Sequence, residues 1–162
     1  MDIKTDWTKI RNHFNKSFKS NFHVSIASVD SENKPTVTPI GTLFLNGNQT
    51  GFYFEKYPSK LPQSATANKN ICILGVNSST WFWLKSLYLV KFDSYPAVKL
   101  YGQLGIRRQA TEIEIDRLNR RMKPTKWTKG NKYLWGDMTT IREITFTNGE
   151  AVNIGKMTNN LK

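Results

Sequence analysis

The sequence predicts a mainly β domain, a small antiparallel barrel of about six strands with a few peripheral helices. Runs of β-branched and aromatic residues recur along the chain, and short polar turns rather than helical crossovers join them. The 162 residues suit one domain, which we expect to cover residues 1–162. An aromatic content of 12% supplies the apolar burial that a disordered chain lacks.

The chain opens with a helical pattern over about residues 6–19, where Trp7, Ile10 and Phe14 recur at spacings of three and four. Asp6 is the expected cap of this helix. The apolar residues then follow the pattern of strands, separated by clusters of turn-forming residues. The strands expected in this part cover residues 22–29, 35–45 and 52–54.

Helices and strands alternate in the rest of the chain. Pro62 suits the first turn of a helix, because its missing N–H costs nothing there. Thr111 and Glu114 match a capping box, which makes the helix after Thr111 the clearest prediction. Asn148-Gly149 is expected to close a strand pair. The expected elements are a helix over about residues 62–69, strands over 71–76 and 97–106, a helix over 112–123, and strands over 141–147 and 151–154.

The charge of the chain points to anionic partners. Lys and Arg number 24 against 12 Asp and Glu, which gives a net charge of +12 and a pI near 9.9. Residues 99–133 hold ten basic residues against three acidic ones. This stretch fits a nucleic-acid footprint, a basic face near a site for a phosphorylated small molecule, or a plain solvated face.

Several classes of protein are disfavoured by what the sequence lacks. The single cysteine, Cys72, cannot form an intramolecular disulfide, which favours a reducing compartment. No apolar run approaches the ~20 residues that cross a bilayer, and the start has no apolar signal core, so we expect a cytoplasmic protein without a membrane partner. His13 and His23 show no metal-site spacing, so no metal is expected and we interpret both as structural. A triad assembled in space stays open.

Two segments favour a ligand site. Ser59 and Lys60 directly precede a predicted helix start, where free backbone N–H groups and the helix dipole attract an anion. The alternative is that Ser59 only caps the helix and Lys60 is solvated. Pro39 and Gly41 interrupt a strand pattern, which would let a flat ring approach the backbone. The alternative there is an edge strand with a bulge.

Together these segments resemble the FMN-binding split barrels, the pyridoxamine 5'-phosphate oxidase-like proteins, over about residues 22–154. The order and spacing of the matching stretches carry the resemblance, and a later stretch is similar to one branch of the family. The matching stretches are Ile26-Ala27-Ser28-Val29-Asp30, Thr38-Pro39-Ile40-Gly41, Gly51-Phe52-Tyr53-Phe54, Ser59-Lys60, Asn68, Ile71-Cys72-Ile73 and Leu134-Trp135-Gly136-Asp137-Met138.

The resemblance implies a six-stranded antiparallel split barrel of Greek-key type that forms a homodimer, with FMN in crevices between the subunits. Ser59 and Lys60 would hold the flavin phosphate, and Gln63 is a further candidate for the phosphate or the ribityl chain. The sequence departs from the family at Leu61, where many relatives carry a second basic residue. The segments expected to face the flavin ring are the backbone of Thr38, Pro39, Ile40 and Gly41 and the strand at Phe54 and Glu55.

Aromatic residues outside these segments have two interpretations. Residues 79–96 form an aromatic insertion that is too apolar to lie bare on a monomer, so it belongs either to the core or to a dimer interface. The functional alternative places Trp81 or Trp83 as a wall beside the flavin. Trp135 is a similar candidate, contributed across the dimer.

The leading functional hypothesis is an FMN-dependent oxidoreductase acting on an unidentified small molecule. A bound flavin supplies the electron chemistry, which agrees with the lack of a catalytic constellation in the sequence. The chain lacks the motifs of the vitamin-processing oxidases, so pyridoxamine phosphate is not assigned as its substrate. Flavin storage or sensing without turnover is the first alternative, a nucleic-acid-binding barrel the second, and haem binding the last.

Overall fold

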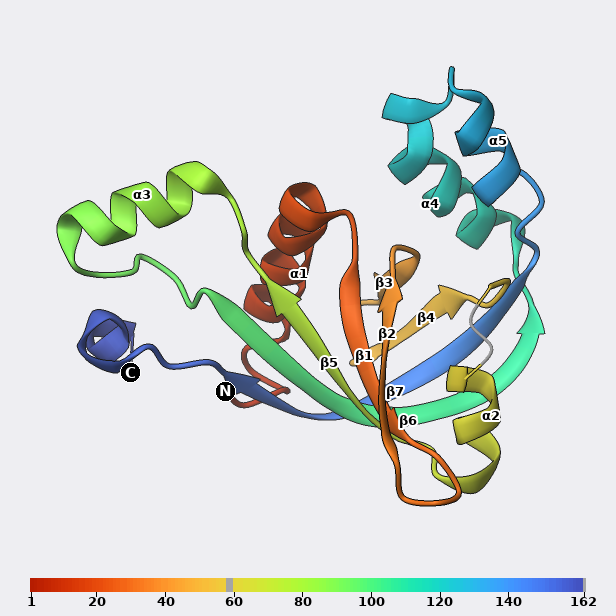
Figure 1. Cartoon of the computed structure of the whole chain (residues 1–162), viewed down its shortest axis with the longest axis horizontal. Coiled ribbons are helices and arrows are strands. Elements are labelled where there is room, and N and C mark those ends of the chain that lie inside the picture. Colours follow the sequence, from red (N-terminus) through yellow and green to blue (C-terminus); the bar gives the residue numbers. More distant parts are fainter. Residues whose placement is uncertain (58–59, 162) are drawn as a thin grey trace.

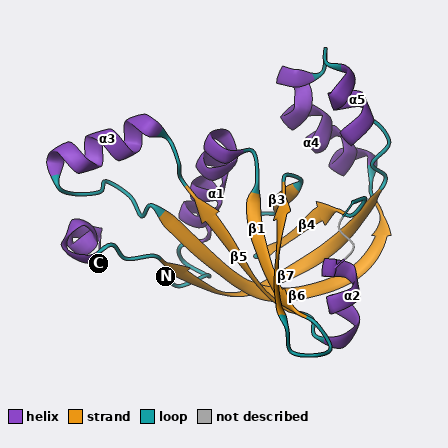
Figure 2. Ribbon diagram, in the orientation of Figure 1, coloured by secondary structure: helices purple, strands orange, loops and turns teal. Residues whose placement is uncertain are grey.

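A curved antiparallel sheet of seven strands forms the body of the protein (Figures 1 and 2). The computed structural model describes residues 1–57 and 60–161. The strands follow the order β2-β1-β5-β6-β7-β4-β3, and each neighbouring pair is antiparallel. Their bounds are β1 (Val24–Val29), β2 (Pro35–Ile40), β3 (Leu43–Leu45), β4 (Thr50–Phe54), β5 (Asn70–Val76), β6 (Ala97–Gln109) and β7 (Thr140–Ala151).

Helices surround the sheet, with α1 packed against it and α2 beside one end (Figure 1). The pair α4 and α5 covers another end, while α3 projects away from the body near the C-terminus. Within the part of the chain that the structure describes, no helix combines the length and apolar character needed to cross a membrane. The helices are α1 (Trp7–Asn21), α2 (Lys60–Ala67), α3 (Thr80–Leu89), α4 (Glu112–Met122) and α5 (Lys129–Trp135), with 3-10 turns at Lys123–Thr125 and Gly155–Leu161.

The mainly β class is confirmed, but the predicted six strands of Greek-key type are not: the sheet has seven strands and curls into a half-barrel with β2 and β3 at its edges. One expected strand, residues 35–45, breaks into β2 and β3. A Cβ at Gly41 would lie 3.1 Å from the Phe22 carbonyl oxygen, so the backbones are close there. Thr42 then donates a hydrogen bond to the Phe54 carbonyl (3.3 Å). The chain therefore leaves β1 at this point and pairs with β4.

The expected hairpin at Asn148-Gly149 is wrong, because β7 runs without a break from Thr140 to Ala151. The register with β6 shifts here, since Gly102 faces Phe146 while Tyr101 faces Asn148. Thr147 is the extra residue, so a bulge directly precedes the turn-like pair, which itself stays paired with Tyr101 and Leu100. A Cβ at Gly149 would meet Ile10 of α1 at 3.2 Å, so glycine allows the helix to lie close to the bent strand.

Two apolar clusters hold these elements together. The larger cluster joins the predicted stripe of α1, including Ile10 and Phe14, to the inner face of the sheet. The smaller cluster stacks Phe44, Phe52 and Phe54 beneath Leu118 of α4. The opening helix is thus confirmed in type and position, and its apolar face is what fixes it to the sheet.

The helix predicted from its capping box is also confirmed. The Thr111 hydroxyl accepts a hydrogen bond from the Glu114 N–H (3.3 Å), and the Glu114 carboxylate accepts one from the Thr111 N–H (2.8 Å). Arg108 at the end of β6 donates to both Glu114 oxygens at 2.9 Å. These bonds tie the start of α4 to the sheet and so fix the direction in which its arginines project.

We predict that His13 makes stability depend on pH. Its ring is buried, and Nε2 donates to the Gly75 carbonyl at 2.8 Å. Burial lowers the pKa of His13 below its ordinary value. In acid the unfolded chain therefore takes up a proton that the folded chain resists, so stability falls as pH drops through 6.5. Urea unfolding at pH 7.5 and 5.5 should show a smaller fall in His13→Phe than in the native sequence, and an equal fall in both would contradict this account.

Candidate functional site

The segments expected to face a flat ring come together in the structure. The hydrogen bond from Thr42 to the Phe54 carbonyl joins the end of β2 to the end of β4. Gly41, the last residue of the predicted segment 38–41, therefore lies beside the pair Phe54–Glu55, which is distant in sequence. The Gly41 carbonyl itself accepts a hydrogen bond from Arg121 (3.3 Å), so part of the backbone here already has a partner.

Helix α2 follows directly and turns its polar residues outward. Leu61 and Ala65 are buried in the larger cluster, where α2 packs on β1 and β2. Lys60 and Gln63 are exposed as a result. Ser59, the other residue predicted to hold a phosphate, lies outside the described residues. Leu61, where the sequence departs from the resembled family, is thus a core position in this chain.

The face of β1 and β2 beside α2 carries unpaired polar atoms. Ser28 and Thr36 are cross-strand partners, and both hydroxyls are buried with no hydrogen-bond partner in the described structure. Thr38 is two residues beyond Thr36 and so lies on the same face. Buried hydroxyls are nearly always paired, so these two indicate a place for a polar partner.

The side chain of Glu55 is buried in a network of its own. Its carboxylate accepts hydrogen bonds from the Tyr53 hydroxyl (2.8 Å) and from Arg142 (2.6 and 3.1 Å). Arg107 forms an ion pair with it at 3.1 Å. Burial, together with the hydrogen bond to Glu55, raises the pKa of Tyr53 far above its ordinary value. The side chain therefore anchors the end of β4, and only the backbone around Glu55 remains to face a ligand.

A hollow rich in lysine adjoins the loop that leads to α2. It has a volume of about 530 Å³. Lys56 forms an ion pair with Asp137, which raises the pKa of Lys56 through their hydrogen bond. The Tyr57 hydroxyl donates to the Tyr133 carbonyl at 3.1 Å, so the loop is held against α5. The residues of this lysine hollow are Lys56, Lys129, Lys132, Tyr133, Gly136 and Asp137.

The lysine hollow was not predicted from the sequence. The basic stretch at residues 99–133 is visible there, but no local pattern places Lys129 and Lys132 beside Lys56. That proximity depends on contacts between residues more than 70 positions apart, which leave no local pattern. The helix α5 itself was not predicted either, because its seven residues include a glycine and no apolar stripe.

The candidate tryptophans lie in two different places, Trp81 and Trp83 on α3 and Trp135 at the end of α5. Trp135 packs against the cluster that contains Phe54, so it is at the same end of the sheet as the converging segments. Trp83 lies on α3, where its indole donates to the Asn77 carbonyl (2.8 Å) and its ring meets Phe92 edge-on. Within one copy of the chain, Trp83 is therefore in another region from Phe54 (Figure 1).

Each of the two histidines contacts a backbone carbonyl. His13 is buried against the Gly75 carbonyl, and His23 Nδ1 lies 2.8 Å from the Asn21 carbonyl oxygen. Both contacts fit the structural interpretation of these rings. Among residues 1–57 and 60–161, no group of histidine, cysteine and carboxylate side chains is arranged to hold a metal ion.

Known proteins are similar to this chain in fold, but none of the comparisons by sequence finds a match. No protein-family model matches the chain, and no curated protein matches it by sequence. The structure, in contrast, is similar to that of an FMN-binding protein from Syntrophomonas wolfei, with a TM-score of 0.60 at 13% identity over 94% of this chain and 95% of the other.

Two further solved structures share the fold. A Clostridium acetobutylicum protein of the pyridoxinephosphate oxidase family, related to general stress protein 26, superposes with a TM-score of 0.54 at 14% identity, over 90% of this chain and 89% of the other. The heme storage protein HutZ from Vibrio cholerae gives a TM-score of 0.56 at 10% identity, over 89% and 92%. At such low identity the likeness concerns the fold.

Proposed function

Because the chain has the split-barrel fold of FMN-binding and pyridoxamine 5'-phosphate oxidase-like proteins, we propose that it binds FMN and acts as an oxidoreductase on a small molecule. One observation carries the proposal beyond the fold. A hydrogen bond joins the end of β2 to the end of β4, and Lys56, two residues beyond Phe54, lines the lysine hollow, so a surface for a flat ring lies close to a concentration of positive charge.

The residues present suit the two ends of FMN. Lys60, with Ser59, would hold the phosphate, and Lys56, four positions earlier in the chain, lines the lysine hollow. Gln63, exposed on the same helix, would serve the phosphate or the ribityl chain. The ring would lie against residues 38–41 and the end of β4, with Trp135 nearby. The unpaired hydroxyls of Ser28 and Thr36, on the same face as Thr38, support a polar ligand against β1 and β2.

A homodimer is part of the proposal. Helix α3 displays a large apolar surface, with Trp81 76% and Tyr88 87% exposed and with Leu84 and Leu87 also open to solvent. Such a patch on a single chain is characteristic of an interface. It follows that most of the aromatic insertion is not core, and a second copy would be needed to place Trp83 beside a flavin.

When bound, flavin supplies hydride and single-electron transfer. The protein side chains then need only bind the cofactor, orient it and exclude water. A flavin-storage or sensing protein would use the same site without turnover. Reduction and reoxidation of the bound flavin therefore distinguish the two functions. Reduction of the FMN-loaded protein by NADH or NADPH, followed by reoxidation, supports an oxidoreductase, and a flavin that no reductant or substrate reduces supports storage.

The basic stretch gives less support to a nucleic-acid-binding barrel than its charge suggested. Arg107 and Arg108 are engaged with carboxylates of the protein. Arg117 and Arg121 lie over aromatic rings between α4 and the sheet. A continuous exposed stripe of cations is what nucleic acid needs, and these four arginines do not provide it.

We predict that Lys60→Ala weakens FMN binding by roughly tenfold or more, because a charge-assisted contact to the phosphate is lost. Titration of FMN into the purified protein, followed by flavin fluorescence, measures the change. Riboflavin, which has no phosphate, should bind equally to both proteins. The matched control is Lys34→Ala, which removes an exposed lysine from the β1–β2 turn and should leave FMN affinity unchanged.

Sedimentation of the same samples tests the dimer. The expected particle holds two chains and two flavins. A protein that stays colourless and monomeric in excess FMN contradicts the proposed function. Equal FMN affinity of the native and Lys60→Ala proteins would show that the FMN phosphate binds at another site.

A further inference from the structure

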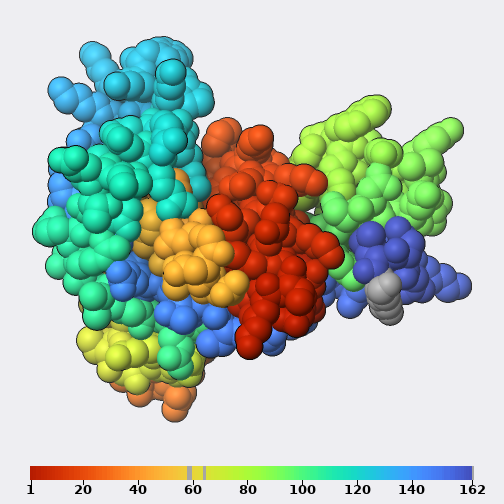
Figure 3. Space-filling view, turned by 180° about the vertical axis from the view of Figure 1, so that it is seen from behind, coloured from red at the N-terminus to blue at the C-terminus, as the bar shows by residue number. Residues whose placement is uncertain are grey.

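A second concentration of positive charge lies on a different part of the molecule. Four arginines gather between α1, the β3–β4 turn and α4 around a hollow of about 490 Å³. Figure 3 shows these three elements, coloured red, amber and teal, meeting on one face, while α2 lies towards the lower end. We call this hollow the arginine pocket. The residues that matter for it are Arg11, Asn15, Phe44, Arg117, Arg120 and Arg121.

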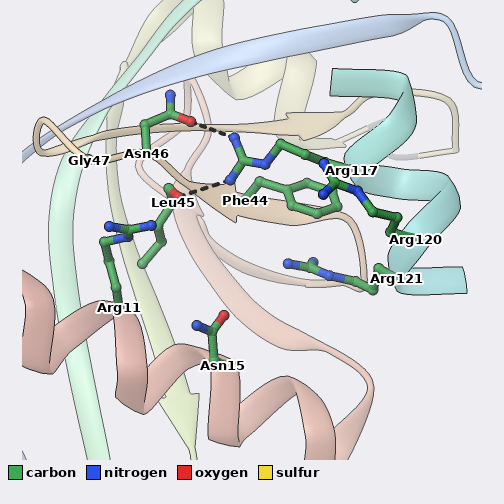
Figure 4. A pocket seen from close by; sticks show the side chains of 9 residues that line it. All are labelled: Arg11, Asn15, Phe44, Leu45, Asn46, Gly47, Arg117, Arg120 and Arg121. Atoms are coloured by element: carbon green, nitrogen blue, oxygen red, sulfur yellow. Dashed lines mark hydrogen bonds between the residues drawn. The ribbon is translucent and has the colours of Figure 1, made fainter. Parts of the chain in front are cut away.

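Aromatic rings and backbone oxygens hold two of the arginines in place. The Arg121 guanidinium lies 3.7 Å from the centre of the Phe44 ring and 4.3 Å from that of Phe18, and it donates to the Leu43 carbonyl at 2.6 Å. The Arg117 guanidinium lies 5.1 Å from the centre of the Phe44 ring. It donates to the Asn46 side chain (2.7 Å) and to the Leu45 carbonyl (3.0 Å) (Figure 4). The charges are thus fixed in advance of any ligand.

No carboxylate lines the arginine pocket. Among the described residues, none of its four arginines has an acidic side chain within 4 Å, whereas Arg107, Arg108 and Arg142 all do. Burial lowers the pKa of Arg121 to about 10, with Arg117 adding repulsion, and the pKa of Arg117 is lowered by burial and by Arg11 and Arg120. Like charges held close in a partly dry site favour a negative ligand.

Donor groups remain for such a ligand. Each guanidinium carries several N–H groups in a planar fork that matches the oxygens of phosphate. Within the described structure Arg11 makes no hydrogen bond through its side chain, and Arg120 uses only Nε, at 3.4 Å to the Asp116 carbonyl. Asn15 adds an exposed amide from α1, which faces α4 across the pocket (Figure 4).

We propose that the arginine pocket binds the phosphate end of a small phosphorylated molecule, at a site separate from the FMN site. Its volume falls in the range of roughly 300–1,000 Å³ usual for small-molecule pockets. It is bounded by elements on three sides, so it suits a discrete anion better than the long backbone of a nucleic acid. Arg121 also donates to the Gly41 carbonyl, so the pocket borders the proposed ring surface. The inference does not depend on FMN binding, because the phosphate would be held by residues of α1 and α4 and not by α2 or the lysine hollow.

Thermal unfolding in inorganic phosphate and in pyrophosphate, at pH 7.5 and constant ionic strength set with NaCl, tests this proposal. Ligand that binds only the folded chain raises the unfolding midpoint. We expect pyrophosphate to raise the midpoint of the native protein. We expect R11Q/R120Q to lose most of the rise, with about tenfold or more weaker binding by calorimetry for each lost contact. Arg11 and Arg120 are chosen because they have few contacts within the protein.

The matched control is K34Q/K156Q, which removes the same charge from two exposed positions outside the pocket and should keep the native response. If R11Q/R120Q does not fold, the exposed single variant R120Q gives the same comparison, and R120K should bind between R120Q and the native protein because it keeps the charge and loses the fork. An equal pyrophosphate response in the native, pocket and control proteins would overturn the proposal.

Two other outcomes would also overturn it. If R11Q/R120Q loses FMN while Lys60→Ala retains it, the pocket is the flavin phosphate site and not a second one. If pyrophosphate has no effect but a single-stranded oligonucleotide binds through Arg11 and Arg120, the pocket belongs to a nucleic-acid surface. Failure of FMN to bind at all, with pyrophosphate binding intact, refutes the proposed function and leaves the arginine pocket standing.

Discussion

Glu55→Gln is expected to lower the free energy of unfolding by about 3 kcal/mol or more, since removing one partner of a buried ion pair leaves the other charge uncompensated. The Glu55 side chain is only 4% exposed, and that of Arg142 14%. Glutamine has the same size, but it cannot balance the charges of Arg142 and Arg107 or accept on both oxygens. Urea denaturation at pH 7 measures the loss, with the dependence on urea concentration expected to stay the same.

The exposed carboxylate of Glu150 provides the control. It pairs with Lys99 (3.0 Å) and accepts from the Tyr101 hydroxyl (2.9 Å), so its contacts parallel those of Glu55 without the burial. Glu150→Gln should therefore cost at most about 1 kcal/mol. Similar losses for the two variants would show that burial of the Glu55 network contributes little. A double-mutant cycle with Tyr53→Phe separates the hydroxyl contact from the ion pairs.

The elements that the sequence predicted well are those whose cause is local. The stripe of α1 needs only residues three and four apart, and the capping box of α4 needs only Thr111 and Glu114. Two strand boundaries were predicted wrongly because they depend on contacts with residues distant in sequence. Gly41 lies close to the Phe22 backbone and Gly149 close to Ile10, so β2 ends early and β7 continues through a turn-like sequence. Neither neighbour is visible in the local pattern.

The same division applies to the candidate site. Residues 38–41 and Phe54 were selected by local features and the resemblance, and the bond through Thr42 brings the end of the first segment to Phe54. The cations that gather in the lysine hollow and the arginine pocket come from elements far apart in sequence. Net charge revealed their number but not their grouping. A basic stretch that looked uniform divides into arginines paired with carboxylates, arginines over rings, and lysines in solvent.

Leu61→Arg places the basic residue that many members of the resembled family carry at this position into the core of this chain. We expect it to lower the free energy of unfolding by more than about 3 kcal/mol. Loss of a buried leucine alone costs about 2–5 kcal/mol, and the guanidinium adds a desolvation cost. Leu61 is fully buried among residues such as Ile26 and Ile40. Urea unfolding gives the stability, and an FMN titration of the folded fraction should show no gain in affinity.

Two variants on the same helix make the Leu61 experiment specific. Leu61→Met conserves volume and should cost less than about 1.5 kcal/mol. Gln63→Arg adds the same charge at an exposed position, so stability should change by no more than about 0.5 kcal/mol, while FMN should bind at least as tightly as before. If Leu61→Arg were instead stable and bound FMN more tightly than Gln63→Arg, position 61 would face the phosphate. The outward face of α2 would then have to be reassigned, because Leu61 and Lys60 cannot both point away from the sheet while Ala65 packs against it.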